Sequence, residues 1–321
     1  MRFRPRHQRN STLHQRGFTL VEAVVVMVVT GILAGTMVLF IRRPVQNYTD
    51  AAARAELSDA ADLALRRMAR ELRTALPNSV RLTGSPGNVW WLEFIPTTSG
   101  GKYLAVEDNA DPAKGTPLSF TAPNAQPFNV IGSMPTVTIS PAGATNLDNF
   151  IVIYNLGPGF TDADAYARGN LALITGANNG NRTISFESYA IGAARGNNIN
   201  PFAAWVAAPA SDKRLANTSP GQRFQVVTRP VIFRCQGSAD GKGTLTRSVV
   251  DFSATPTFPN ASAGILMASN VVDCDFSIGS AANQQSALVG LNLSLGRPNP
   301  DGGNAIETVT LTHQIHLDNI P

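Results

Sequence analysis

The pattern of apolar and polar positions changes twice along the chain, and each change marks a different kind of element. From Phe18 to Ile41 the chain is apolar over 24 residues, with Glu22 as the one charged residue. Beyond Pro77, short β-like runs alternate with stretches rich in Gly, Pro, Asn, Ser and Thr. The pattern predicts an α+β fold, in which one long N-terminal helix packs on an antiparallel β-rich head with long loops. Between these parts, from Asn47 to Leu76, apolar residues recur at helical spacings of three and four, at Ala53, Leu57, Ala61, Leu65, Met68, Leu72 and Leu76.

The apolar run is long enough to cross a membrane. As a helix it extends about 36 Å, against a hydrocarbon core of about 30 Å. Arg42 and Arg43 follow it and can reach the far interface. The excess of positive charge before the run, compared with the two arginines after it, places the N-terminus in the cytoplasm and the bulk of the chain on the periplasmic side of an inner membrane. The run is preceded by five arginines and no acid, at Arg2, Arg4, Arg6, Arg9 and Arg16.

Two common kinds of apolar N-terminal segment compete for this run. A secretory signal peptide has an apolar region of about 7–15 residues and an Ala-x-Ala-like cleavage site. The run is longer than that and offers only a poor site at Ile32–Thr36. A plain single-span anchor fits the length but leaves Glu22 unexplained, because a carboxylate inside a span is costly. The physics of the run alone favours the plain anchor, since Glu22 lies near the cytoplasmic end and can reach the interface.

The amphipathic segment is expected to continue the span as one helix and to end at Pro77-Asn78. Pro44, between the two segments, predicts a kink or a local break. Asp62 and Arg66 have the spacing of an ion pair on the exposed side of a helix. Such a helix either packs its apolar face on the head of its own chain or forms a short coiled-coil stalk.

The head is expected to consist of short strands joined by turns. Ala239–Gly243 has the composition of a hairpin turn, and Pro230 implies an edge or a bend. The loops Gly157–Asn170 and Gly192–Gly221 are expected to be poorly packed, and the stalk–head boundary falls near Leu82–Gly87. The expected strands are Val89–Ile95, Tyr103–Val106, Thr136–Ile139, Phe150–Leu156, Leu171–Ile174, Thr183–Phe186, Phe224–Thr228, Val231–Arg234, Thr244–Phe252, Val271–Ile278, Ala287–Leu295 and Ala305–Leu317.

The two cysteines, Cys235 and Cys274, lie in β-like segments with 38 residues between them. In the periplasm such a pair is expected to form a disulfide. Closing a loop of that size stabilises a fold by about 4 kcal/mol in the chain-entropy model. Two buried free thiols are the alternative.

Candidates for catalysis or metal binding are few. His313 and His316 stand three residues apart in one predicted strand, so they face opposite sides of a sheet and cannot share a metal. His7 and His14 lie in the basic N-terminal segment, which leaves a Ser-His-Asp triad or a His-rich zinc site nearly excluded. The sequence therefore predicts a protein that is not an enzyme and that needs no cofactor. Five acids in Gly/Asn-rich loops are either surface turn residues or Ca²⁺ ligands without EF-hand spacing, at Asp108, Asp111, Asp162, Asp164 and Asp301.

The charge of the chain is unevenly distributed. The formal net charge falls from +4 to −1 once the five arginines of the first seventeen residues are set aside. A nearly neutral remainder lacks the basic surface that nucleic-acid binding requires. No nucleic-acid partner is expected.

The residues around Glu22 resemble the class III signal of type IV prepilins. That signal has a short basic leader ending in glycine, then Phe and Thr-Leu-(apolar)-Glu at the start of an apolar span, and Gly17–Glu22 reads Gly-Phe-Thr-Leu-Val-Glu. The resemblance implies that a prepilin peptidase cuts between Gly17 and Phe18 and that Phe18 is then N-methylated. It also implies that Glu22 pairs with the amino terminus of a neighbouring subunit, where two opposite buried charges compensate each other and set the register.

Further stretches resemble the MshO-type minor pilins of the mannose-sensitive haemagglutinin (MSHA) pilus system. They lie at both ends of the chain, and the resemblance is weak between about residues 84 and 222. The J-type minor pseudopilins of type II secretion share the signal and the helix-plus-sheet head, but they lack the Pro77-Asn78 stretch and the His-Gln-x-His ending. The resembling stretches are Phe40–Tyr48, Ala55–Asp62, Arg66–Arg73, Leu76–Arg81, Ser269–Phe276 and His313–Pro321.

The resemblance implies a minor pilin that assembles through its N-terminal helix and initiates or caps a filament. Its expected partners are the prepilin peptidase, other major and minor pilins, the inner membrane and the pilus assembly platform. The chain would divide into a cleaved cytoplasmic leader (1–17), a transmembrane and filament-core helix (18–41), an amphipathic periplasmic helix (42–81) and a β-rich head (82–321). After membrane insertion it would move to the pilus at the cell surface. A membrane-anchored periplasmic binding protein is the alternative from another class.

Overall fold

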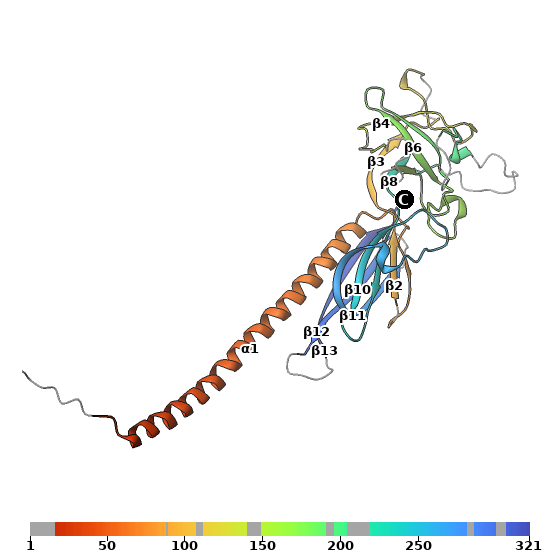
Figure 1. The fold of residues 1–321 in the computed structure, drawn as a ribbon. Helices are drawn as coiled ribbons and strands as arrows, with labels where there is room; N and C mark the ends of the chain where they lie inside the picture. Colours follow the sequence, from red (N-terminus) through yellow and green to blue (C-terminus); the bar gives the residue numbers. More distant parts are fainter. Residues whose placement is uncertain are drawn as a thin grey trace, which may run out of the picture. The chain divides into compact units, whose positions relative to one another are not determined.

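The computed structural model of the chain describes residues 17–87, 89–106, 112–139, 149–190, 196–203, 218–280, 286–299 and 306–321. The chain divides into two compact units, Met1–Ala55 and Glu56–Pro321, which are considered separately. One helix, α1 (Leu20–Leu72), contributes to both units (Figure 1).

The first unit contains the N-terminal part of α1. Its described apolar side chains between Phe18 and Ile41 are exposed except for the half-buried Ala23, and none of the most apolar window is buried. The helix continues through Pro44, so the expected local break is wrong. Proline removes one N–H donor, and the helical assignment on both sides of Pro44 is continuous.

The second unit begins with the rest of α1, Glu56–Leu72. The expected apolar face is buried, with Ala61, Leu65, Met68 and Leu72 fully inaccessible to solvent. These residues pack on the sheet of the same chain, which fits the expected packing of the helix on its own head. Arg66 Nε lies 2.6 Å from Asp62 Oδ2, so the expected ion pair on the exposed side is confirmed.

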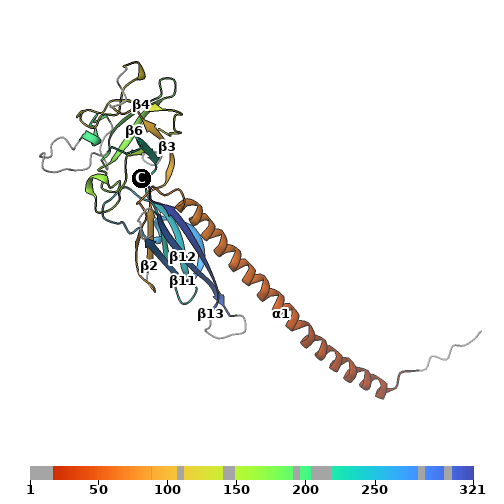
Figure 2. The same cartoon turned by 180° about the vertical axis from the view of Figure 1, so that it is seen from behind.

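A seven-stranded sheet covers this part of α1 (Figures 1 and 2). All neighbouring strands pair antiparallel. An α+β fold with one long N-terminal helix and an antiparallel β-rich head is therefore confirmed. The strands, in spatial order, are β1 (Arg81–Thr83), β2 (Val89–Phe94), β9 (Val231–Gln236), β10 (Gly243–Val249), β11 (Ile265–Ser280), β12 (Ser286–Pro298) and β13 (Ile306–Asp318).

The other six strands form a closed antiparallel barrel. The barrel is inserted in the sequence between β2 and β9, although these two strands are neighbours in the sheet. Around the barrel the strands are β3 (Thr97–Tyr103), β4 (Phe128–Ile131), β7 (Thr183–Ser188), β6 (Leu171–Asn178), β5 (Phe150–Val152) and β8 (Arg223–Val227). The described connections contain single-turn 3-10 helices at Pro112–Lys114 (η1), Thr161–Ala163 (η2), Pro201–Ala203 (η3) and Ala261–Ala263 (η4).

Three apolar clusters hold the second unit together. The helix–sheet core joins α1 to the sheet through residues such as Leu65, Phe233 and Leu291. The barrel core is filled by aromatic rings, among them Phe128 and Phe224, whose centroids are 5.6 Å apart. The junction core lies between the two and consists of Leu76, Ile95, Phe150, Val152, Ala165, Tyr166, Leu171, Leu173, Val227 and Phe252.

The helix ends earlier than expected, at Leu72 rather than Leu76. The Thr74 and Ala75 amides close the end of the helix by donating to the Glu71 and Leu72 carbonyls, and the chain then turns towards the strands. The Leu76 amide donates to the Ile95 carbonyl at 2.7 Å, and Ala75 forms an isolated bridge with Pro96. The Leu76 side chain consequently enters the junction core.

Several strand predictions are wrong in the head. The predicted strands Tyr103–Val106 and Thr136–Ile139 are absent, whereas β1, β3 and β4 were not expected. β3 has a polar sequence that does not resemble a strand. Its Gly101 lies so close to the Phe224 ring that a Cβ there would stand 2.8 Å from Cζ. The hairpin at Ala239–Gly243 is confirmed, because β9 and β10 pair across it.

The loop Gly157–Asn170 is not poorly packed, contrary to expectation. Its Tyr166 side chain is buried in the junction core and donates a hydrogen bond to the Ser79 carbonyl at 2.8 Å. The side-chain oxygen of Asn155 accepts from the Ala165 amide at 3.0 Å. Of the second loop, Gly192–Gly221, residues 192–195 and 204–217 lie outside the described ranges.

A disulfide joins Cys235 on β9 to Cys274 on β11, with 6.4 Å between their Cα atoms. Both residues lie in the helix–sheet core. Replacing both cysteines by alanine should lower the free energy of unfolding by about 2–4 kcal/mol, because the unfolded chain regains the entropy of an open loop. Urea unfolding of the full chain in detergent micelles measures the change. The wild-type chain under reducing conditions should shift its midpoint equally, and an unchanged midpoint in both cases contradicts the prediction.

Candidate functional site

The N-terminal segment begins with three non-helical residues, Gly17–Thr19, before α1 starts at Leu20. Thr19 caps the helix: its hydroxyl oxygen accepts from the Glu22 amide at 3.3 Å, and its carbonyl accepts from the Ala23 amide at 3.2 Å. Thr-x-x-Glu at this position is the pattern of a capping box. This cap was not predicted from the sequence, although the Thr-x-x-Glu pattern of Thr19–Glu22 is its signal.

Gly17 has no structural requirement for glycine. A Cβ placed on it would meet no atom within 4 Å. The same is true of the two glycines inside the apolar run, Gly31 and Gly35. A substitution at Gly17 therefore changes the chemistry of the segment without disturbing described packing.

The apolar side chains of this segment form a continuous exposed surface. Phe18 is 74% exposed and Leu20 81%, and the exposed residues extend through Val24–Val29 to Ile41. Glu22 is also exposed. Among the described residues, α1 is the one helix long and apolar enough to cross a membrane. An apolar surface of this size requires lipid or other apolar helices around it, so the segment is suited to a membrane and to helix bundling.

The two histidines of β13 take the predicted faces. His316 is exposed, whereas His313 is half-buried on the face of Ile315, and its Nε2 lies 3.8 Å from Asp62 Oδ1 on α1. Within the described ranges, no group of three or more His, Cys, Asp or Glu side chains is placed to hold a metal ion.

The loop acids that were weighed as Ca²⁺ ligands are only partly described. Asp108, Asp111 and Asp301 lie outside the described residues. Asp164 is buried, and its carboxylate accepts from the Tyr166 amide at 2.9 Å. Burial raises the pKa of Asp164. Its position is that of a loop-closing residue.

A buried ion pair stands behind this loop. Arg81 Nε lies 2.7 Å from Glu93 Oε2, and the two side chains are 11% and 3% exposed. The guanidinium also lies 3.6 Å from the centroid of the Tyr166 ring and donates to the Ser253 carbonyl at 2.8 Å. Burial raises the pKa of Glu93, and the hydrogen bond from Arg81 opposes that rise. No local sequence pattern reveals this pair, because Arg81 lies on β1 and Glu93 on β2.

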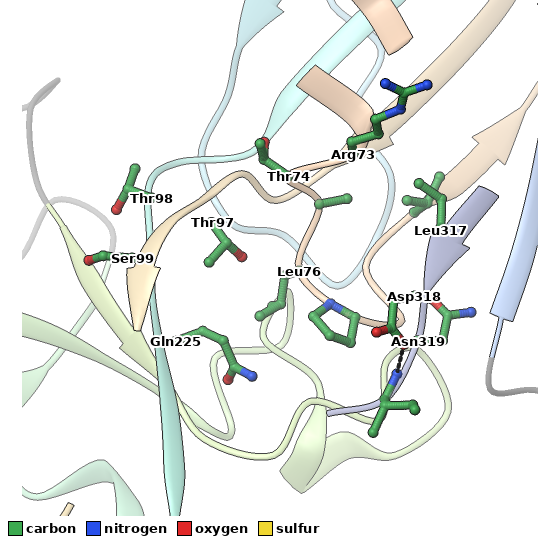
Figure 3. Close-up of a pocket in the computed structure, with 14 residues that line it drawn as sticks. Arg73, Thr74, Leu76, Thr97, Thr98, Ser99, Gln225, Leu317, Asp318 and Asn319 are labelled. Atoms are coloured by element: carbon green, nitrogen blue, oxygen red, sulfur yellow. Dashed lines mark hydrogen bonds between the residues drawn. The ribbon is translucent and has the colours of Figure 1, made fainter. Parts of the chain in front are cut away.

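The segment that follows α1 contacts the C-terminal segment of the chain. The Asn78 amide donates to Asn319 Oδ1 at 3.2 Å, and the Asn78 side chain donates to the Asn155 carbonyl at 2.9 Å. An open groove of about 380 Å³ lies next to these contacts (Figure 3). Two side-chain oxygens in its lining residues, Thr97 Oγ1 and Gln225 Oε1, are buried without a hydrogen-bond partner. The mixed lining gives no ligand chemistry of its own.

Comparison with known proteins gives a result for the N-terminal segment. Residues 12–38 match the family model described as the prokaryotic N-terminal methylation motif. Neither the curated proteins nor the solved structures give a match to the chain. The matched residues include the non-helical start, the cap and most of the exposed apolar run. The chain thus carries the N-terminal methylation motif of type IV prepilin-like proteins, and this motif covers the start of an exposed apolar helix.

Proposed function

We propose that the protein is a minor subunit of an MSHA-type type IV pilus, which initiates or caps the filament and has a structural rather than a catalytic role. The observation that carries the proposal is the methylation motif at residues 12–38, placed on a helix whose apolar surface is exposed. The specific pilus system rests on the resemblance of both chain ends to MshO-type minor pilins. The contact between Asn78 and Asn319 supports it, because these residues belong to two of the resembling stretches.

In this proposal the chain has four parts. Residues 1–17 are a cytoplasmic leader that prepilin peptidase removes, and residues 18–41 form the membrane and filament-core helix. Residues 42–81 continue the helix on the periplasmic side, and residues 82–321 form the head. The mature chain begins with N-methylated Phe18, first in the inner membrane and then in the pilus at the cell surface.

Glu22 has the central role in assembly. Its carboxylate accepts a charged hydrogen bond from the methylated amino group of a neighbouring subunit, which neutralises both charges inside a packed bundle of apolar helices. The exposure of Glu22 on the single chain leaves the carboxylate accessible to such a partner. The assembly platform and the other major and minor pilins are the remaining partners.

The test is the intact mass and N-terminal sequence of the membrane-extracted chain, from cells with and without prepilin peptidase. A peptidase-dependent start at N-methyl-Phe18 supports the proposal. A start at Met1 in both strains leaves a plain membrane anchor and overturns it. Co-purification with MSHA-type pilins, rather than with type II secretion components, distinguishes the pilus from the J-type pseudopilin role.

Substituting Gly17 by aspartate should abolish processing. A charged side chain at the scissile position obstructs the peptidase, while nothing in the described structure packs against Gly17. Immunoblots should show only the long precursor, with the chain still in the membrane. His14→Asp, which adds the same charge three residues upstream, is the matched control and should be processed. A mature product from Gly17→Asp contradicts the assignment of the cleavage site.

A further inference from the structure

The two edges of the seven-stranded sheet differ in length. Among the described residues the sheet ends at β1 on one side and at β13 on the other. β1 has 3 residues, which leaves few backbone groups for another strand, whereas β13 has 13 residues. Very short edge strands are one device by which proteins prevent unwanted pairing. The sheet is therefore blunted at β1 and open at β13.

β13 carries no device that would blunt it. It pairs with β12 from Ile306 to Asp318 without a register shift, whereas β11 contains shifts. It has no proline and no lysine. Its exposed face between Glu307 and Asp318 carries no Asp, Glu, Lys or Arg and presents Thr308, Thr310, Thr312, Gln314 and His316. About half of its N–H and C=O groups point away from β12, over a length of about 44 Å.

The opposite face of β13 is incompletely covered. Ile315 and Leu317 are buried, but Val309 and Leu311 are only half-buried at the margin of the helix–sheet core. A further strand beside β13 would cover these two side chains and extend the core. The chemistry that fits is an uncharged strand with β-branched residues on both faces, which pairs well with threonine and valine.

A second copy of the chain does not fit this edge. His313 lies beside Asp62, and Asn319 is bonded to Asn78 beyond the end of α1, so β13 and this part of α1 run in the same direction. Two identical edges pair antiparallel about a two-fold axis, which would oppose the two helices. Head-to-tail pairing would instead use β1, which is too short.

We infer that β13 accepts a strand from a different pilin-like subunit, which extends the sheet across the subunit boundary by β-strand addition. This inference rests on the proposed function, because it needs neighbouring subunits with parallel helices. The partner strand is uncharged and rich in β-branched residues. The contact is made mainly by main-chain hydrogen bonds, so the partner strand lies along the β13 edge. Side chains such as Gln314 set the register of the two strands.

Hydrogen exchange of the full chain tests the inference at the backbone. The peptide 306–318 is compared between the purified chain in detergent micelles and the chain in sheared filaments. Assembly should slow the exchange of about half of its amides at least about tenfold, because the outward N–H groups gain acceptors. The amides already bonded to β12 should change little. Unchanged exchange in filaments that contain the chain overturns the inference.

A matched pair of variants tests the same edge in cells. Gln314, Gly290 and Ser277 form one row across β13, β12 and β11. Gln314→Lys places a charge at the edge, and Ser277→Lys places the same charge on an exposed site two strands inside. Thr308→Lys combined with Gln314→Lys should reduce incorporation at least about fivefold, while Ser277→Lys should leave it unchanged.

The remaining outcomes distinguish a failure of strand addition at β13 from a failure of the proposed pilin function. Concentration-dependent protection of 306–318 in the purified chain alone would identify a second copy as the partner and overturn the inference. Normal processing and incorporation of the double lysine variant would also overturn it and leave the pilin role intact. A wild-type chain that is neither processed nor incorporated would remove the proposed function, and the strand addition with it.

Discussion

Replacing Glu22 by glutamine should leave the chain inserted and processed but reduce its incorporation into filaments at least about tenfold. Glutamine keeps the shape of the side chain and can serve the helix cap, since Gln is accepted at the third position of a capping box. It removes the charge that, in the proposed assembly, pairs with the methylated amine of a neighbouring subunit. A tenfold loss corresponds to about 1.4 kcal/mol, close to the lower end of the roughly 1.5–3 kcal/mol that a hydrogen bond to a charged group contributes.

The experiment compares sheared filaments with the membrane fraction by quantitative immunoblot. Thr19→Ala is the control for the cap, because the Thr19 hydroxyl holds the Glu22 amide. That variant should weaken the first helical turn by about 1 kcal/mol and affect incorporation far less. Equal losses for Thr19→Ala and Glu22→Gln would assign Glu22 to the cap instead. Full incorporation of Glu22→Gln would remove the charge pairing.

The head should lose about 3–5 kcal/mol of stability when Arg81 is replaced by alanine. The loss arises because Glu93, which is 3% exposed beside Arg81 in the wild-type chain, is left without its charged partner. Two carbonyl groups, of Ser253 and Ala254, and the ring of Tyr166 lose their contacts with the guanidinium at the same time. Arg223, which is exposed, provides a control substitution expected to change stability by less than about 0.5 kcal/mol.

The stability deficit of the Arg81→Ala variant should depend on pH, because it comes from the ionised form of Glu93. Burial already raises the pKa of Glu93, and Arg81 is the group that lowers it. Without Arg81 the folded state binds a proton more readily than the unfolded state. The deficit should therefore shrink as the pH falls through the raised pKa of Glu93 and reach its full, constant value above it.

Urea midpoints of the full chain in micelles, measured between pH 5 and 8, test this dependence. Arg81→Met combined with Glu93→Gln should recover most of the stability, because no charge is then left buried. A pH-independent deficit would show that the loss comes from packing alone.

The elements that the sequence predicted well are those whose pattern is local. The face Leu57–Leu72 follows a helical period, and its burial depends on that period alone. The long strands β12 and β13 alternate in the same local way. The N-terminal signal is also local, because Gly17–Glu22 is read by position along the chain.

The barrel could not be predicted, because it depends on pairing between distant segments. β3 contains Thr, Ser and two glycines and is a strand only because β8 and β4 lie on either side of it. No local pattern reveals that β2 and β9 are neighbours with six strands between them in the sequence. The buried Arg81–Glu93 pair was hidden for the same reason. The packed loop depends on Asn155 and Tyr166, whose partners are likewise distant.

The insertion of the barrel has a consequence for how such a head can change. The chain leaves the sheet after Phe94 and returns at Val231, and at this point the Thr228 amide donates to the Pro96 carbonyl at 3.0 Å. Entry and exit are thus one hydrogen bond apart. Any domain whose own termini lie close together could occupy this position, provided that it covers Leu76, Ile95 and Phe252 of the junction core. The helix and the sheet would then stay unchanged while the inserted domain, and the surface that it presents, is replaced.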